Sequence, residues 1–576
     1  MRKYNRPAVT DIQLNDKIFA GRIKACIEGT IPAAMAKTVE TGRLNAFRLN
    51  WKEGMPQKPH IFWDSDVAKV LEGMAYCLAL KPDEKLEKEY DQWVDLIVSA
   101  QQEDGYLNTY FIQVEPEKHW KNLSWDHELY CAGHLMEAAV AGYECLGKRK
   151  LLDCMCRYAD YIDSVFGLEE GKRRGWPGHE EIELALIKLY RTTGNERYKK
   201  LASYFVNDRG TQPHVFQQEE GFYDDGMAMQ AHKPIREQET AVGHAVRAVY
   251  LYAGAADVAD ENNDQELLNA CDRLFETIRQ QKMYITGGIG SAFPGECFTI
   301  PYDLTNSSLM YAESCATIGL AQFAIRMFNL TGDQKYLEVM ELALYNGALA
   351  GVSLKGDAFF YTNYLEVDDN LTLYNAGAKV RQEWFGCSCC PTSYSRFIPQ
   401  LGTFLWSTGK NEISLNIPAA CHADLKMADG RTVSVKVEGD YPYDGKIRII
   451  METAGDYQLS LRIPEWCKQY SVKLNGTPCE KTIRKNWNAG DIVELDLEIP
   501  ITVIHSNPKI TTNNGRVALK RGPLVYALEQ VDNQQPVRET LIRTDRPFRL
   551  VPASAELPEG TLAIEGEAVR EYFENE

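Results

Sequence analysis

Residues 185–205 read ALIKLYRTTGNERYKKLASYF, which is the end of an apolar helix, a turn at Gly194 and a second, amphipathic helix. The same order recurs at residues 139–159 (AVAGYECLGKRKLLDCMCRYA) and at residues 323–343 (FAIRMFNLTGDQKYLEVMELA). In each stretch the glycine falls where a helix C-terminus requires positive φ. With weaker copies near residues 81–82 and 260–264, the hairpins recur roughly every 45 to 70 residues, and about five or six of them can close into a toroid.

The pattern of apolar residues changes to a period near two after about Gly409, in stretches such as EISLNIP, TVSVKVEG and YQLSLRIP. Turn pairs such as Asn475-Gly476 lie between these stretches and suit tight hairpins. We therefore predict a helical domain at residues 1–408 and an antiparallel β-sandwich at 409–507, followed at 508–576 by a second β-sandwich portion with a C-terminal tail.

Composition and charge narrow the classes of partner. The formal net charge of −18 argues against nucleic acid and leaves a neutral small molecule or glycan as the easier ligand. The first 17 residues contain no apolar leader and the chain has no long apolar run, so we expect a cytoplasmic protein without a membrane partner. The sequence does not fix the oligomeric state, and a homodimer is compatible with it.

Three cysteines crowd into residues 383–392, EWFGCSCCPT. Adjacent cysteines such as Cys389 and Cys390 rarely bridge to each other, and soft thiolates favour zinc or a similar metal. One pair cannot fill a tetrahedral site, but Glu313 and Cys315 in YAESCATIGL could supply the remaining two ligands at the start of a helix. The alternative is that these cysteines are buried small apolar residues.

A Gly-rich and Pro-rich stretch at residues 283–304, MYITGGIGSAFPGECFTIPYDL, predicts a long ordered loop in the helical domain. Glu296 is its first carboxylate, and a carboxylic acid there can protonate a leaving group if burial raises its pKa. The alternative is a solvated loop glutamate.

Histidines and aromatic residues at predicted helix entries are candidate sugar contacts. His127, His179 and His244 would point into the central funnel of a toroid, although a lone histidine is more often a structural hydrogen-bonding group. Aromatic rings can stack on sugar faces, although core packing is the commoner role of any single ring. The aromatic candidates are Trp63, Trp125, Trp176, Tyr361 and Trp384.

Several stretches together resemble the bacterial β-L-arabinofuranosidases of glycoside hydrolase family 127. They are FWDSDVAKVLEG, HELYCAGHL, HEEIELALIKLYRTTG, AVGHAVRAVYLYAG, YITGGIGS, YAESCATIGL and WFGCSCCP. The resemblance runs over about residues 8 to 405, and later segments such as SLRIPEW and RGPLVYALE resemble the accessory sandwiches of that family. The ESC and GCSCC segments are its most specific part.

The resemblance implies a retaining glycosidase with an (α/α)6 barrel followed by β-sandwiches, and a bound zinc ion. The family's nucleophile, a cysteine that also binds the metal, matches Cys389, and the other ligands match Cys390, Glu313 and Cys315. The general acid/base matches Glu296.

The family's sugar-binding residues match His127, His179, His244 and Tyr361, with His134 as an alternative for the first. The sequence departs from the family pattern at residues 391–393, Pro-Thr-Ser, and at Cys297, which follows the acid/base. Neither departure removes a ligand or a catalytic group.

These expectations describe an exo-acting enzyme that releases terminal β-L-arabinofuranose from short oligosaccharides. In a competing mechanism Glu313 attacks and the zinc is only structural. Two other hypotheses stay open: a glycosidase or lyase of the same fold that acts on another sugar, and a non-catalytic glycan-binding protein with structural zinc.

Overall fold

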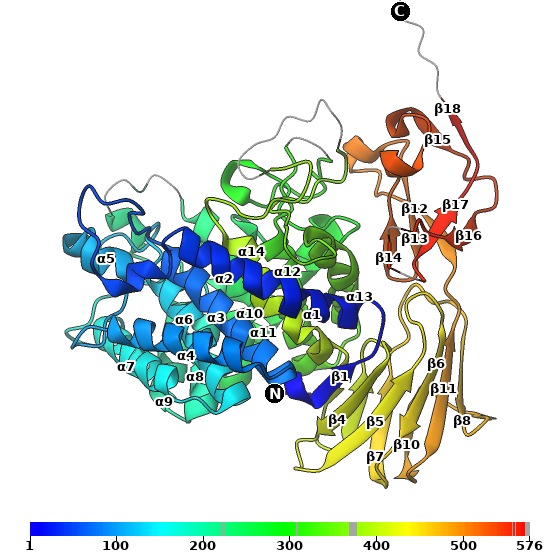
Figure 1. Ribbon diagram of the computed structural model, residues 1–576, viewed down its shortest axis with the longest axis horizontal. Coiled ribbons are helices and arrows are strands. Elements are labelled where there is room, and N and C mark those ends of the chain that lie inside the picture. The colour runs from blue at the N-terminus through cyan, green and yellow to red at the C-terminus, as the bar shows by residue number, and fades with distance from the viewer. Residues whose placement is uncertain are drawn as a thin grey trace, which may run out of the picture.

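The computed structural model describes residues 1–219, 222, 225–306, 309–367, 377–555, 557–558 and 560–570 (Figure 1). A helical barrel forms the N-terminal part, and two groups of strands stand beside it. Among the described residues, none of the helices combines the length and the apolar character needed to cross a membrane.

Six helices form a closed inner ring, because each contacts the next and the last contacts the first. They are α3 (Trp63–Leu80), α6 (Glu128–Leu146), α8 (Ile182–Thr193), α10 (Ala245–Asn262), α12 (Ser314–Thr331) and α14 (Cys389–Phe397). The outer layer consists of α2 (Ile31–Glu40), α4 (Glu84–Ser99), α7 (Lys150–Val165), α9 (Glu196–Asp208), α11 (Gln265–Gln281) and α13 (Lys335–Leu342), and short helices α1 (Phe19–Ala25) and α5 (Thr109–Gln113) complete the set. This arrangement is the predicted (α/α)6 barrel.

The difference between the two layers follows from the sequence pattern. Helices α3, α6, α10 and α12 bury nearly their whole length, whereas α4, α7, α9 and α11 bury one apolar face. The helices end where the sequence predicts: Gly147, Gly194 and Gly332 have φ of 68°, 73° and 76° at the C-termini of α6, α8 and α12. Each turn sends the chain back along the outside, so the inner helices all run the same way and their N-terminal ends meet at one mouth of the barrel.

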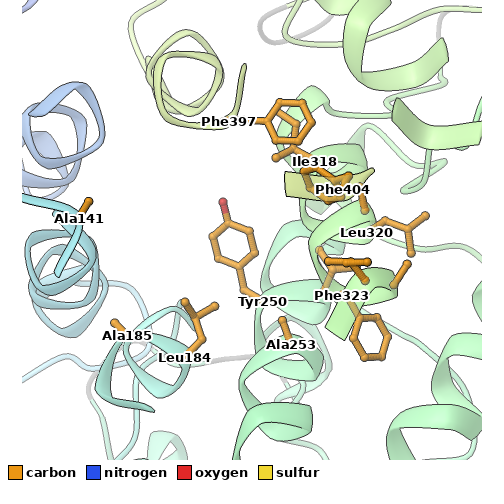
Figure 2. Close-up of a cluster of buried hydrophobic side chains, with 14 of the residues drawn as sticks. Ala141, Leu184, Ala185, Tyr250, Ala253, Ile318, Leu320, Phe323, Phe397 and Phe404 are labelled. Atoms are coloured by element: carbon orange, nitrogen blue, oxygen red, sulfur yellow. The ribbon is translucent and has the colours of Figure 1, made fainter. Parts of the chain in front are cut away.

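Small residues let the inner helices pack closely. A Cβ on Gly133 of α6 would lie 2.9 Å from the Cα of Ile182, and a Cβ on Gly319 of α12 would lie 2.5 Å from Cγ2 of Val249. Figure 2 shows the small side chains of Ala185 on α8 and Ala253 on α10, with larger buried side chains such as Tyr250 and Phe323 around them. The inner ring is therefore a tightly packed frame for the side chains at its mouth.

A two-sheet sandwich follows the barrel. The seven-stranded sheet has the order β1-β4-β5-β6-β11-β8-β9, and the four-stranded sheet has the order β10-β7-β3-β2. Their strands are β1 (Ile12–Leu14), β2 (Trp406–Thr408), β3 (Glu412–Leu415), β4 (Cys421–Lys426), β5 (Thr432–Glu438), β6 (Lys446–Met451), β7 (Gly455–Leu461), β8 (Tyr470–Leu474), β9 (Thr477–Pro478), β10 (Thr482–Trp487) and β11 (Asp491–Leu497). The pairs are antiparallel except β3 with β7, which is parallel.

Two strands of this sandwich come from the range predicted as the helical domain. Strand β1 at Ile12–Leu14 pairs with β4, and β2 begins at Trp406. Strand β1 has only three residues, too few to show an alternating pattern in the sequence. The N-terminal segment therefore links the two parts, and the domain limits at 408/409 and 507/508 stay predictions.

The C-terminal part forms smaller sheets. Strands β12 (Ile501–His505), β13 (Val517–Arg521) and β14 (Leu524–Tyr526) make one sheet, and β15 (Thr540–Ile542) with β18 (Ala568–Arg570) and β16 (Arg549–Pro552) with β17 (Leu562–Glu565) make two more. Figure 1 shows this part next to the sandwich. It contacts the barrel through Asn346, whose Nδ2 donates to the carbonyl of Pro523 at 2.9 Å. A C-terminal tail is expected from about Gly566, but Ala568–Arg570 form strand β18, and residues 571–576 lie outside the described residues.

Candidate active site

Two inner helices bring three thiols and one carboxylate together at the mouth of the barrel. Glu313 is the N-cap of α12 and Cys315 lies in its first turn, while Cys389 and Cys390 are the first two residues of α14. Oε1 of Glu313 is 3.4 Å from Sγ of both Cys389 and Cys390. The Cys315 and Cys390 sulfurs are 3.3 Å apart, and those of Cys389 and Cys390 are 3.9 Å apart.

A buried ion pair holds the segment that leads into α14. Nε of Arg43 is 2.8 Å from Oδ2 of Asp66, and Nη2 of Arg43 donates to the carbonyl of Gly386 at 2.8 Å. Both charged side chains are almost fully buried. Since removing one partner of a buried pair is costly, this clamp fixes the approach to the cysteines.

The donor set fits a tetrahedral zinc ion. Zinc with bonds of about 2.3 Å to sulfur keeps its sulfur ligands about 3.8 Å apart, close to the spacings seen here. Among the described residues, Oε2 of Glu313 is buried without a hydrogen-bond partner. Burial and the neighbouring Cys389 raise the pKa of Glu313 well above its ordinary value, and burial raises the pKa of Cys390. A divalent cation would compensate the crowding of these acidic groups.

The four groups differ in their exposure to solvent. Glu313, Cys315 and Cys390 are buried, whereas Cys389 is partly exposed. The Tyr361 hydroxyl lies 3.0 Å from Sγ of Cys389 and 3.8 Å from Sγ of Cys387. Cys389 is therefore the member of the cluster that a substrate can reach.

Glu296 lies near Glu313. The carboxylates of Glu296 and Glu313 and a ring nitrogen of His244 lie within 4.8 Å of one another. Nε2 of His244 is 2.7 Å from Oε2 of Glu296, and the Tyr311 hydroxyl also hydrogen-bonds this carboxylate. Burial alone would raise the pKa of Glu296, but these two hydrogen bonds and the charge of Arg247 outweigh it and leave the pKa lowered.

The backbone at Glu296 is strained in a way that aims its side chain. Glu296 has φ of 57° and the preceding Gly295 has φ of 73°, so the chain makes two left-handed steps in a row. A non-glycine residue in this region costs free energy and is enriched at functional sites. The Gly-rich loop predicted from the sequence therefore holds its glutamate in a fixed position.

Three histidines line up beside this carboxylate. The ring centroids of His127 and His179 are 5.6 Å apart, and those of His179 and His244 are also 5.6 Å apart. Nδ1 of His127 lies 2.7 Å from the carbonyl of Trp125, and Nδ1 of His179 lies 3.1 Å from the carbonyl of Glu180. A carbonyl only accepts, so in each neutral ring Nδ1 carries the hydrogen and Nε2 can accept a hydroxyl hydrogen.

These rings are held in the neutral form. Burial, together with the charge of Arg247, lowers the pKa of His127 to about 3 and that of His179 well below its ordinary value. The two rings are thus suited to accept hydrogen bonds from a neutral polyhydroxylated ligand.

The structure brings together the residues that the sequence assigned to the metal, to catalysis and to the three sugar-binding histidines, with Tyr361 beside Cys389. The aromatic candidate Trp176 is instead fully buried against His214 and Phe216, and the alternative, His134, also lies outside the site. That residue is buried in the core, where its Nδ1 lies 3.1 Å from Glu181. Two contacts were missed: Tyr311 beside Glu296, and Arg247 beside the histidines. Tyr311 precedes the ESC motif by two residues, which was its only signal in the sequence.

The barrel carries acidic, thiol and imidazole groups at one mouth. Comparison with known protein families identifies the chain as a glycoside hydrolase. The GH127 catalytic domain of β-L-arabinofuranosidases matches residues 11–403. The middle domain of the same family matches residues 412–499, and its C-terminal domain matches residues 501–556. The chain belongs to glycoside hydrolase family 127.

Individual relatives agree with this assignment. The chain is 38% identical over 509 residues to a non-reducing end β-L-arabinofuranosidase of Bifidobacterium longum subsp. longum, covering 82% of this chain and 76% of the relative. A crystal structure of a GH127 β-L-arabinofuranosidase from Geobacillus stearothermophilus T6 is 41% identical, with a TM-score of 0.92 over 97% of this chain and 92% of its own. A solved structure of a GH127 β-arabinofuranosidase is 35% identical and has a TM-score of 0.91; the match covers 98% of this chain and 92% of that chain.

Proposed function

We propose that this protein is an exo-acting, retaining glycosidase that removes terminal β-L-arabinofuranosyl units from short oligosaccharides, with Cys389 as nucleophile and Glu296 as general acid/base. The observation that carries the proposal is the unequal exposure of the cluster: Glu313, Cys315 and Cys390 are buried and Cys389 is partly exposed, while Glu313 also groups with Glu296 and His244. The substrate class rests on the relatives, which are named for this sugar.

We propose that Glu313, Cys315, Cys389 and Cys390 hold a zinc ion. Such an ion keeps a coordinated sulfur in the thiolate form at neutral pH. The N-terminal ends of α12 and α14, which carry the four ligands, add the positive ends of two helix dipoles. Tyr361 orients the sulfur, because its hydroxyl lies 3.0 Å from Sγ of Cys389.

The reaction proceeds in two displacements. In the first, Sγ of Cys389 bonds to C1 of the sugar as the C1–O bond breaks, and Glu296 gives its proton to the departing oxygen. In the second, Glu296 takes a proton from water, the water oxygen bonds to C1, and the C1–S bond breaks to restore the thiolate. Two inversions at C1 leave the configuration unchanged.

The resting arrangement matches the second displacement, since His244 and Tyr311 stabilise Glu296 as a carboxylate. The first displacement therefore requires Glu296 to take up a proton before the bond breaks. His127 and His179 bind the sugar by accepting hydroxyl hydrogens at Nε2.

The test is hydrolysis of an aryl β-L-arabinofuranoside, followed by NMR during the first turnovers. We expect free L-arabinofuranose to appear first as the β anomer. Initial release of the α anomer would exclude a retaining reaction, and a panel of aryl pentosides left intact would exclude the proposed activity.

A non-catalytic protein with structural zinc is less well supported. Structural sites are usually closed by four protein ligands that are shielded from solvent. Here the Cys389 sulfur is partly exposed, and Glu313 lies near the strained Glu296, which contacts one of three aligned histidines; a structural site does not need these groups.

A further inference from the structure

Trp125 lies in a rigid loop at the rim of the site. Oδ1 of Asn122 accepts from the backbone N–H of Trp125 at 3.2 Å, and the Glu219 carboxylate accepts from the N–H groups of Leu123 and Ser124 at 2.8 and 3.0 Å. The Trp125 carbonyl accepts from His127 Nδ1 at 2.7 Å. The backbone is therefore fixed on both sides of a ring that is itself 47% exposed.

One face of this ring already has a partner. The guanidinium carbon of Arg247 lies 5.5 Å from the ring centroid, within the range of a cation–π contact, and the Arg247 side chain is almost fully buried. The contact restricts the orientation of the indole. A large, rigid apolar ring that is half exposed to water can bind a ligand. Covering it is favourable by about 25 cal/mol per Å² of apolar surface removed from water.

The position of Trp125 identifies the ligand. Arg247, which holds the ring, also interacts electrostatically with Glu296, and His127 continues the histidine line that ends in the His244–Glu296 hydrogen bond. Trp125 thus lies on the acid/base side of the pocket, whereas Cys389 contacts Glu313, Cys390 and Tyr361. Because the general acid protonates the departing oxygen, the leaving group must lie on the acid/base side.

We infer that Trp125 is the platform of a leaving-group subsite, on which the ring of the sugar or aryl group attached to the arabinofuranosyl unit stacks. The inference rests on the proposed function. With this subsite, the enzyme should favour an arabinofuranosyl unit linked to another ring over one linked to a small alcohol. Only a ring covers the indole face that Arg247 leaves open.

The experiment compares two leaving groups on the same glycosyl unit. The Trp125→Ala enzyme and the wild type are assayed with a disaccharide that carries a terminal β-L-arabinofuranosyl unit and with methyl β-L-arabinofuranoside. We expect kcat/KM for the disaccharide to fall by about 10- to 50-fold and kcat/KM for the methyl glycoside to change by less than about twofold. Trp125→Phe, which keeps an aromatic face, should recover most of the loss.

A matched control is Tyr470→Ala on strand β8 of the sandwich, since Tyr470 is also 47% exposed. It should change neither value, and circular dichroism should show all variants folded. Equal losses for both substrates in Trp125→Ala, or no loss for either, would overturn the subsite. If the wild type cleaves neither arabinofuranoside, the proposed function is wrong, and the same comparison is made on the glycoside that the enzyme does cleave.

Discussion

The Sγ atom of Cys389 lies 3.4 Å from Oε1 of Glu313, a residue 76 positions earlier in the chain. Two different inner helices therefore supply one cluster, and neither segment could hold a metal alone. The proposed chemistry depends on this contact, because it places a partly exposed sulfur among buried ligands, one of which, Glu313, also lies near Glu296.

Removing the metal should abolish activity and lower stability. We expect elemental analysis to find about one zinc ion per chain, and dialysis against a chelator to remove activity and lower the Tm, because the buried acidic groups lose their counter-charge. Added Zn²⁺ should restore both. Cys315→Ser should lose the metal, whereas Cys479→Ser, at a thiol next to strand β9, should retain it. Full activity in metal-free protein would contradict the role proposed for the ion.

Two cysteines of GCSCC, Cys387 and Cys389, should differ in their effects. Cys389→Ser should lower kcat on the order of 10³-fold or more, because a serine hydroxyl does not ionise as a metal-bound thiol does. Cys387→Ser changes a thiol two residues away that does not belong to the cluster, so we expect it to keep its metal and most of its activity. Near-normal turnover of Cys389→Ser with metal bound would favour attack by Glu313.

Tyr311 should act as a positioning residue for Glu296. Its hydroxyl hydrogen-bonds the carboxylate, and a hydrogen bond to a charged group contributes about 1.5–3 kcal/mol, so Tyr311→Phe should lower kcat about 10- to 100-fold. Because the Tyr311 hydroxyl stabilises the Glu296 carboxylate, Tyr311→Phe should also raise the pKa of Glu296, which the pH dependence of kcat/KM reports, with KM little changed. Tyr284→Phe is the control, because the Tyr284 hydroxyl donates to the Thr305 carbonyl instead. A loss of kcat with an unshifted pH profile would argue for a purely structural role.

Much of the fold was predictable because its signals are local. A repeated apolar pattern and glycines such as Gly194 predict the helix pairs. The change of the apolar period near residue 409 predicts the strands. Other features depend on contacts that a sequence does not display. The three-residue strand β1 joins the sandwich through β4, and the parallel pairing of β3 with β7 is set by how the sheet closes.

Some features of the active site were also predictable from the sequence, and others were not. The segments that carry Glu313 and Cys389 were identified by their resemblance to a family, and the distances between them follow from the closure of the barrel. The hydrogen bond from Tyr311 to Glu296 depends on how a long loop folds back on α12, and the sequence gives no sign of it. His134 lies about two helical turns after His127, the N-cap of α6 at the mouth, and so falls among core residues instead of in the site.

Stability should depend on pH through Glu128, the first residue of α6. This side chain is 1% exposed, accepts from the Tyr106 hydroxyl at 2.5 Å and from the Trp120 N–H at 2.8 Å, and burial raises its pKa to about 8. A raised pKa means that the folded state favours the protonated carboxyl. That contribution to stability is complete below the unfolded pKa of about 4.3 and is lost as the pH rises through about 8.

We therefore expect the wild type to lose stability relative to Glu128→Gln as the pH rises from about 5 to about 8. The difference in the free energy of unfolding should change by about 1 kcal/mol per pH unit. Urea unfolding at three pH values across this window measures the difference. Glu117→Gln, at an exposed glutamate nearby, should follow the wild type at each pH. Parallel curves for wild type and Glu128→Gln would mean that Glu128 is ionised in the folded protein.

The most direct test of the nucleophile is to trap it. The enzyme is incubated with an electrophilic β-L-arabinofuranose analogue, digested, and mapped by mass spectrometry. We predict one added sugar mass on the peptide that contains Cys389, located on that sulfur by fragmentation, and loss of labelling in Cys389→Ser. A label on Glu313, with Cys389 unmodified, would contradict the account and assign the attack to the carboxylate.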